Sequence, residues 1–293
     1  MLIDDFLNYL RFERNYASLT VHNYGNDLKS FESYFKSLDS QLTWESVDTD
    51  VIRNWMESMM DKGNAATSIN RRLSALRSFF RFALARGAVG HDPAHQVRGP
   101  KKQKVLPQYV RETELDSLID NTATEEGFIP MRARTIIMMF YETGLRLSEL
   151  VTLDDIQVDL ERMEVKVTGK RNKQRVVPFG EELAGQVRRY IEVRNQAVPV
   201  SDGALFVTPK GERMNPAQVR YLVQKQIARV SARKKRSPHV LRHSFATAML
   251  NHDAGIESVR KLLGHESLST TEIYTHTTYE QLKKVYDNAH PRA

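Results

Sequence analysis

Two histidines and an arginine lie close together in the run SPHVLRHSF at residues 237–245. Serine is favoured as a helix N-cap and proline at the first helical position, so the run predicts a helix that begins at Pro238. His239 and Arg242 are three residues apart, which puts both side chains on one face of the first turn. Free backbone N–H groups and the positive end of the helix dipole favour an anion there. The run therefore predicts a phosphate-binding site.

The same run allows a metal-binding alternative. His239 and His243 have the i, i+4 spacing of two metal ligands on a helix. However, Val240 stands where a metalloprotease needs its glutamate. The sequence therefore favours phosphate over a zinc hydrolase, and unchanged activity in a chelator would exclude the zinc enzyme.

A second candidate residue is Arg146, in the run TGLRLSEL at residues 143–150. Gly144 is expected to end one helix, and Glu149 lies in the next, so Arg146 is held at a junction between two leucines that should be buried. A buried arginine costs desolvation free energy unless it meets an anion or a carboxylate. Arg146 is thus predicted either to bind an anion or to pair with an acid such as Glu149.

Three further residues occupy positions from which they could reach a ligand. Residues 163–168 alternate between apolar and polar, and residues 175–178 can return as a partner strand, so Lys170 falls near the tip of a hairpin. Lysines at such tips also serve solubility alone. His265 follows Gly264, which suits the end of a helix, and Tyr274 lies inside a helix expected from about residue 269.

The elements before these motifs are predicted to be helical. Apolar stripes indicate four helices within residues 1–88, the last from about Thr67 to Arg86. Its expected buried stripe is Ile69, Leu73, Leu76, Phe80 and Leu84. The same helix carries the basic residues Arg71, Arg72, Arg77, Arg81 and Arg86, which form either a solvated face or a surface that lies along a phosphate backbone.

The length of the chain and the position of a linker predict its domain organisation. A chain of 293 residues predicts two domains: residues 1–88 and 108–293, joined by an exposed linker at 89–107. The linker contains Lys101, Lys102 and Lys104, which could contact a polyanion. The fold class expected is mainly α with a small β-sheet: an all-α N-terminal domain and an α+β C-terminal domain.

The composition narrows the class of protein. Forty-one per cent hydrophobic and 27% charged residues are typical of a globular protein, and the net charge of +7 is modest for a nucleic-acid binder. The absence of cysteine excludes disulfides, thiolate zinc sites and cysteine nucleophiles. Acidic residues stand where a signal peptide needs positive charge, and no apolar run reaches membrane-spanning length, so a cytoplasmic protein is expected.

Four motifs occur in one order: GLRLSEL at 144–150, HVLRH at 239–243, LLGH at 262–265 and IYTH at 273–276. Together they resemble the signature motifs of the tyrosine recombinases, or integrase family, whose plan of a helical core-binding domain and a mixed catalytic domain covers the whole chain. The compact length and the ending resemble the Xer recombinases, and the ending is most similar to the XerC group.

The resemblance implies specific roles. Tyr274 is the implied nucleophile, which forms a 3′-phosphotyrosyl link to DNA without metal, ATP or other cofactor. The implied catalytic set is Arg146, Lys170, His239, Arg242, His265 and Tyr274. The family often has glycine after the hairpin lysine, where this chain has Arg171; Lys173 is therefore a rival to Lys170, which is preferred.

The resemblance also implies partners. Double-stranded DNA at a recombination site is the expected substrate, held by a DNA-bound tetramer of two copies with two of a homologous recombinase. The final helix, from about residue 279, is expected to pack on its own domain or dock on a neighbour. The role implied is resolution of chromosome dimers for segregation at cell division; the alternative is an integrase of a phage or mobile element. The DNA-binding residues expected are Arg71, Arg72, Arg77, Arg81, Lys101, Lys102 and Lys104.

Overall fold

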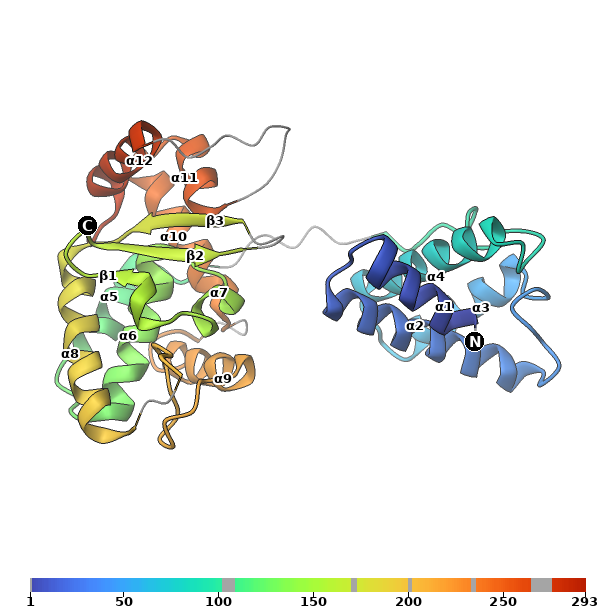
Figure 1. The fold of residues 1–293 in the computed structure, drawn as a ribbon, viewed down its shortest axis with the longest axis horizontal. Helices are drawn as coiled ribbons and strands as arrows, with labels where there is room; N and C mark the ends of the chain where they lie inside the picture. Colours follow the sequence, from blue (N-terminus) through green and yellow to red (C-terminus); the bar gives the residue numbers. More distant parts are fainter. Residues whose placement is uncertain (1, 102–108, 170–172, 200–201, 233–235, 265–275) are drawn as a thin grey trace. The chain divides into compact units, whose positions relative to one another are not determined.

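The computed structural model describes residues 2–101, 109–169, 173–199, 202–232, 236–264 and 276–293 (Figure 1). The chain divides into two compact units, Met1–Val105 and Leu106–Ala293. Each unit has a hydrophobic core of its own. In the described parts of the chain, no helix is both long and apolar enough to cross a membrane.

The N-terminal unit is helical, as predicted. Its apolar stripes meet in one core, in which Phe31, Trp55 and Phe79 are buried. Leu84, predicted to be buried, is 44% exposed, because the three-residue step from Phe80 brings Ala83 onto the core face instead. The elements are α1 (Leu2–Asn8), the π-helical turn η1 (Tyr9–Glu13), α2 (Ser18–Leu38), α3 (Thr49–Asp61) and α4 (Ala66–Ala85).

The segment after α4 is not the exposed linker that was predicted from residue 89. Ala94 and Val97 are buried in the core of the N-terminal unit, and their carbonyls accept hydrogen bonds from Arg77. Asn70 donates to the Pro100 carbonyl at 2.8 Å. Apolar residues scattered without helical period thus cover α4, a role that periodicity does not reveal.

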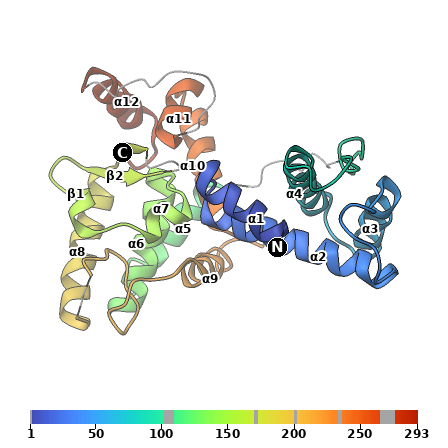
Figure 2. The same cartoon turned by 45° about the vertical axis from the view of Figure 1, so that its right-hand side comes forward.

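The C-terminal unit is built around α6 (Phe128–Thr143), a helix with most of its residues buried. It packs against α8 (Glu181–Ala197), α9 (Pro216–Ile227) and α10 (Pro238–Asn251). Figures 1 and 2 show α11 (Ile256–Leu263) and α12 (His276–Ala289) together at one end of the unit, and α9 at the other. The short helices α5 (Glu112–Asn121), α7 (Leu147–Val151) and η2 (Asp155–Gln157) complete the helical set of the described residues.

The sheet has three antiparallel strands in the order β1–β2–β3: Val158–Asp159, Glu164–Thr168 and Gln174–Pro178. Strands β2 and β3 form the predicted hairpin, with Thr168 opposite Gln174. Residues 204–208 lie outside the described sheet. Only isolated bridges from Ala204 to Asp154 and from Val207 to Arg213 form there.

The C-terminal helix packs on its own unit. Leu282 and Tyr286 of α12 are buried against Phe245 and Leu262. Beyond the helix, Arg292 pairs with three acids, Asp116 at 2.9 Å, Asp120 at 3.1 Å and Glu182 at 2.7 Å. The structure thus shows the packing within the chain, and docking of this helix on a neighbour stays a prediction.

A buried histidine makes the packing of this C-terminal segment sensitive to pH. His290 is 5% exposed and stacks on Tyr286, with ring centroids 5.0 Å apart, and on Phe245, at 5.7 Å. Burial lowers the pKa of His290 to about 4, although its hydrogen bond to the Tyr141 carbonyl acts in the opposite direction. The folded state therefore holds the neutral imidazole at pH values where the unfolded chain is protonated.

We expect the free energy of unfolding to fall as the pH is lowered from about 6.5 to about 4, by up to about 3 kcal/mol from His290. Above the unfolded pKa this contribution is fully present. Urea unfolding midpoints measured across this range, for the wild type and His290→Gln, check the expectation. The variant should show the shallower dependence; parallel slopes would contradict it.

Candidate active site

Arg242 lies in the interior of the C-terminal unit, close to the start of α10. The helix begins at Pro238 as predicted, after Ser237, although the described residues show no cap hydrogen bond to the Ser237 side chain. Arg242 is 6% exposed and donates to the carbonyls of Gly144 at 2.5 Å and Leu263 at 2.6 Å.

The buried guanidinium of Arg242 has an electrostatic cost. Burial, followed by repulsion from Arg146 and Arg175, lowers the pKa of Arg242 to about 9. Among the described residues, no carboxylate lies within ion-pair distance of it. An incoming anion would therefore recover part of the free energy spent on keeping this cation out of water.

Arg146 stands directly before α7, with a side chain that is 33% exposed. Its Nη1 donates to Glu149 Oε1 at 2.7 Å, and its backbone N–H donates to Glu149 Oε2 at 2.8 Å. Its Nη2 donates to the Gly264 carbonyl at 2.8 Å. Glu149, which the sequence offered as a possible partner, thus pairs with Arg146. The side chain of Arg146 is only partly covered, so a ligand can also reach it.

The two arginines meet at the end of α11. Arg242 donates to the carbonyl of Leu263 and Arg146 to that of Gly264, which are consecutive in the chain. Gly144, which supplies the other carbonyl for Arg242, has a φ of 59°, and a Cβ there would lie 2.6 Å from Phe245. Glycine is required at this junction, because a side chain would force α6 and α10 apart.

A third arginine completes the charged cluster. Arg175 of β3 donates to both oxygens of Glu149, at 2.6 and 2.9 Å, and is 7% exposed. Burial raises the pKa of Glu149, but the contacts with Arg175 and Arg146 outweigh it and hold that pKa at about 2. The carboxylate is therefore ionised. Two arginines pair with it and Arg242 lies nearby, so the described cluster carries excess positive charge.

Arg175 was not among the sequence candidates. It alternates with Val176 and shares the inward side of β3 with Val177, which is buried. An arginine on the inward side of a strand requires a buried anion, so the alternation held a signal for a second partner of Glu149.

The histidines and the hairpin complete what the structure describes here. His239 lies on the first turn of α10 and is exposed. His243 is exposed as a residue, but partial desolvation of its imidazole, followed by the nearby His239 and Arg242, lowers its pKa. A Cβ at Gly169 would lie 3.5 Å from Glu149 Oε1 and 3.9 Å from Arg146 Nη1. The start of the hairpin turn therefore lies against the Arg146–Glu149 pair.

Three members of the expected catalytic set, Lys170, His265 and Tyr274, lie outside the described residues. Two of them adjoin described residues in the sequence: Lys170 follows Gly169, and His265 follows Gly264. Lys173, the rival lysine, is described; its carbonyl accepts from the Gly169 N–H at 2.7 Å.

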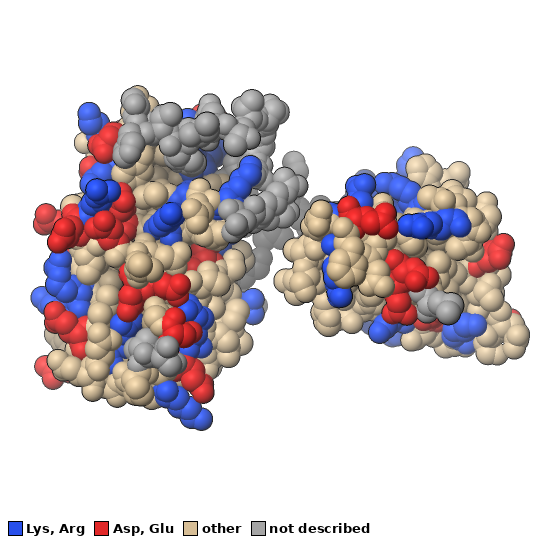
Figure 3. Space-filling view, in the orientation of Figure 1, with Lys and Arg blue, Asp and Glu red and all other residues tan. Residues whose placement is uncertain are grey.

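Most of the expected DNA-binding arginines make contacts within the N-terminal unit. Arg71 and Arg72 pair with the buried Asp27, and Arg77 donates to main-chain carbonyls. Arg81 is exposed. Lys101 is also exposed, whereas Lys102 and Lys104 lie outside the described residues. On the visible face of each unit, basic and acidic side chains are interspersed (Figure 3).

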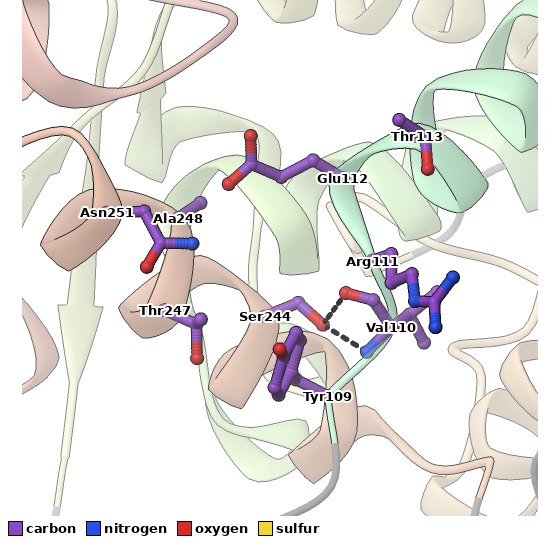
Figure 4. A pocket seen from close by; sticks show the side chains of 9 residues that line it. All are labelled: Tyr109, Val110, Arg111, Glu112, Thr113, Ser244, Thr247, Ala248 and Asn251. Carbon is purple, nitrogen blue, oxygen red and sulfur yellow. Dashed lines mark hydrogen bonds between the residues drawn. The ribbon is translucent and has the colours of Figure 1, made fainter.

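A cavity of about 340 Å³ lies on another side of α10. Figure 4 shows Ser244 of α10 joined to Val110, on the chain that leads into α5, by two hydrogen bonds. Of the expected catalytic residues that the structure describes, Arg146, His239 and Arg242, none lines this cavity. Of the candidates that the structure describes, Arg146 and Arg242 lie instead where α6, α7, α10 and α11 meet.

Comparison with known proteins identifies relatives for both units. Residues 108–281 match the phage integrase family, and residues 3–87 match the N-terminal SAM-like domain of phage integrases. The chain is 38% identical to a tyrosine recombinase XerC of Chlorobaculum parvum, over 99% of this chain and 94% of that protein. It is 37% identical to a tyrosine recombinase XerC of Pelotomaculum thermopropionicum, over 99% and 98%.

Solved structures share the fold. The XerH site-specific recombinase bound to its palindromic difH substrate matches with a TM-score of 0.72 and 22% identity, over 96% of this chain and 83% of that one. The XerA recombinase matches with a TM-score of 0.51 and 25% identity, over 100% and 99%. The predicted architecture, mainly α with a small sheet, is confirmed.

Proposed function

Because the chain belongs to the phage integrase family, we propose that it is a site-specific tyrosine recombinase of the Xer type. It cuts DNA strands and rejoins them through a 3′-phosphotyrosyl intermediate. The observation that carries the proposal is the convergence of Arg146, directly before α7, and Arg242 of α10 on the consecutive carbonyls of Gly264 and Leu263. Their excess positive charge suits a phosphodiester.

In this mechanism the Tyr274 hydroxyl attacks the phosphorus and displaces the 5′-oxygen of the next nucleotide. An ordinary tyrosine has a pKa of about 10 and is a poor nucleophile near neutrality, so nearby cations favour the phenolate. Arg146 and Arg242 donate to the non-bridging oxygens, where negative charge builds up in the transition state.

The remaining residues transfer or position protons. His239 and His265 donate to the phosphate oxygens or accept the phenolic proton. Lys170 protonates the leaving 5′-oxygen; the position of Gly169 beside Glu149 and Arg146 supports a hairpin lysine in this role. Attack by the 5′-hydroxyl of another strand reverses the step, and the phosphotyrosyl bond conserves the energy for rejoining.

Strand exchange between two duplexes requires four active sites, so the protein acts as a DNA-bound tetramer, with two copies beside two of a homologous recombinase. The full-length similarity to XerC proteins supports resolution of chromosome dimers in the cytoplasm before cell division. Contacts from the exposed Arg81 and Lys101 to phosphates would help to hold the duplex.

A nicked duplex that carries a candidate chromosomal recombination site tests this function. Cleavage beside the nick releases a short fragment, so that religation fails and the covalent protein–DNA adduct accumulates. We expect an adduct, equally abundant in excess EDTA and without ATP. The absence of adduct on every chromosomal site, with adduct on an attachment site only in the presence of DNA-bending proteins, would favour the integrase alternative.

A further inference from the structure

We propose that Arg175 is a positioning residue of this site, which takes up both oxygens of the Glu149 carboxylate and so leaves Arg146 available to the DNA phosphate. The inference rests on the proposed function, since the phosphate belongs to the strand that would be cut. Arg175 acts through its neighbours.

The contacts of Arg175 join three elements. Its Nη1 and Nη2 donate to Glu149 of α7 at 2.6 and 2.9 Å, and its Nε donates to the carbonyl of Leu262 in α11 at 2.9 Å. A Cβ at Gly264 would lie 3.1 Å from Arg175 Cδ. All three guanidinium nitrogens therefore donate to protein groups, and the side chain fixes β3, α7 and the end of α11 relative to one another.

Glu149 is the residue through which Arg175 affects Arg146. The Glu149 side chain is 1% exposed and accepts four hydrogen bonds: two from Arg175, one from the Arg146 backbone and one from Arg146 Nη1. A buried carboxylate must be fully paired, and a planar guanidinium pairs best with both of its oxygens. Arg175 pairs with both oxygens of Glu149, so Arg146 needs to give only one side-chain donor, Nη1, to this carboxylate.

Loss of Arg175 would change how the Arg146 guanidinium is shared between Glu149 and the DNA phosphate. Among the described residues, the cation still in contact with Glu149 would be Arg146, while Arg242 acts on it only at longer range. The carboxylate would then draw the Arg146 guanidinium inward as a two-pronged partner. That guanidinium would no longer be available to the phosphate.

The substitutions Arg175→Met and Arg175→Lys test this role. Methionine keeps much of the apolar stem, whereas lysine keeps a cation but not the paired donors. We expect covalent adduct to form about 10- to 100-fold more slowly with Arg175→Met, with an intermediate loss for Arg175→Lys, because partners that orient site residues have effects of this size. DNA binding should be unchanged, since the effect is on the chemical step.

The double variant Arg175→Met/Glu149→Gln distinguishes positioning from a purely structural role. A neutral amide at position 149 no longer draws Arg146 inward, so the double variant should form adduct faster than Arg175→Met alone. Arg194→Met is the matched control: Arg194 is 1% exposed and pairs with Asp155 at 2.7 Å through both Nη atoms. The Arg194→Met variant should lower the unfolding midpoint, but the folded protein should form adduct at the wild-type rate.

The outcomes separate this inference from the proposed function. Slow adduct formation by both Arg175 variants, with partial recovery in the double variant, supports it. Wild-type rates for Arg175→Lys, or a double variant no faster than Arg175→Met, overturn it while the recombinase function stands. No adduct from the wild type overturns both.

Discussion

Tyr274→Phe should abolish the covalent adduct while leaving DNA binding intact. The phenylalanine ring fills the same space but has no oxygen that can attack phosphorus, so no phosphotyrosyl bond forms. The loss should be complete, because water in the site would give hydrolysis and not a protein adduct. Denaturing gel electrophoresis of the nicked duplex after incubation with each protein gives the comparison, and a mobility shift under native conditions reports binding.

Tyr279→Phe is the matched control for this substitution. Tyr279 belongs to α12 and lies five residues further along the chain. Burial raises the pKa of its hydroxyl above the ordinary tyrosine value. Its hydroxyl is therefore even less suited to nucleophilic attack, and its loss should leave adduct formation near the wild-type level. An adduct from Tyr274→Phe would show that another residue is the nucleophile.

Arg242→Lys should reduce the rate of adduct formation by about a hundredfold or more, the size of effect seen when one donor to a transition-state oxygen is removed. Lysine keeps the charge. It cannot donate to the carbonyls of Gly144 and Leu263 and to a phosphate oxygen with the fixed planar geometry of a guanidinium. Single-turnover rates at saturating protein separate this loss from weaker binding.

Arg132→Lys provides the control for Arg242. Arg132 is also buried, at 7% exposed, and donates to the main-chain carbonyl of Val207 at 2.5 Å, but it lies outside the charged cluster. Both substitutions should lower stability to a similar degree. If Arg132→Lys slowed adduct formation as much as Arg242→Lys, the effect would be one of folding and not of catalysis.

The regular elements could be predicted from the sequence because they depend on local pattern. Helical period placed α4 to within one residue at each end, the serine and proline before the first turn gave the start of α10, and strand alternation gave the β2–β3 hairpin. The segment at residues 89–101 could not be predicted in this way. Its burial depends on contacts such as that of Val97 with Arg77, which no repeat in the sequence records.

The charged residues show where reading by residue type reaches its limit. Arg242 was predicted to bind an anion, and Arg146 either to bind an anion or to pair with an acid; the structure brings the two together and pairs Arg146 with Glu149. The arginines of α4 have the same charge, yet Arg71 and Arg72 face Asp27, an acid from another helix. Residue type alone cannot distinguish an arginine that can bind a ligand from one that pairs with an acid of the same protein, because the difference depends on tertiary contacts.

Identification of the residue that carries the DNA tests the central claim most directly. The adduct trapped on the nicked duplex would be digested with protease and nuclease, and the modified peptide sequenced by mass spectrometry. The account predicts a nucleotide joined through its 3′-phosphate to the oxygen of Tyr274. Attachment to any other side chain, or through a 5′-phosphate, would contradict it.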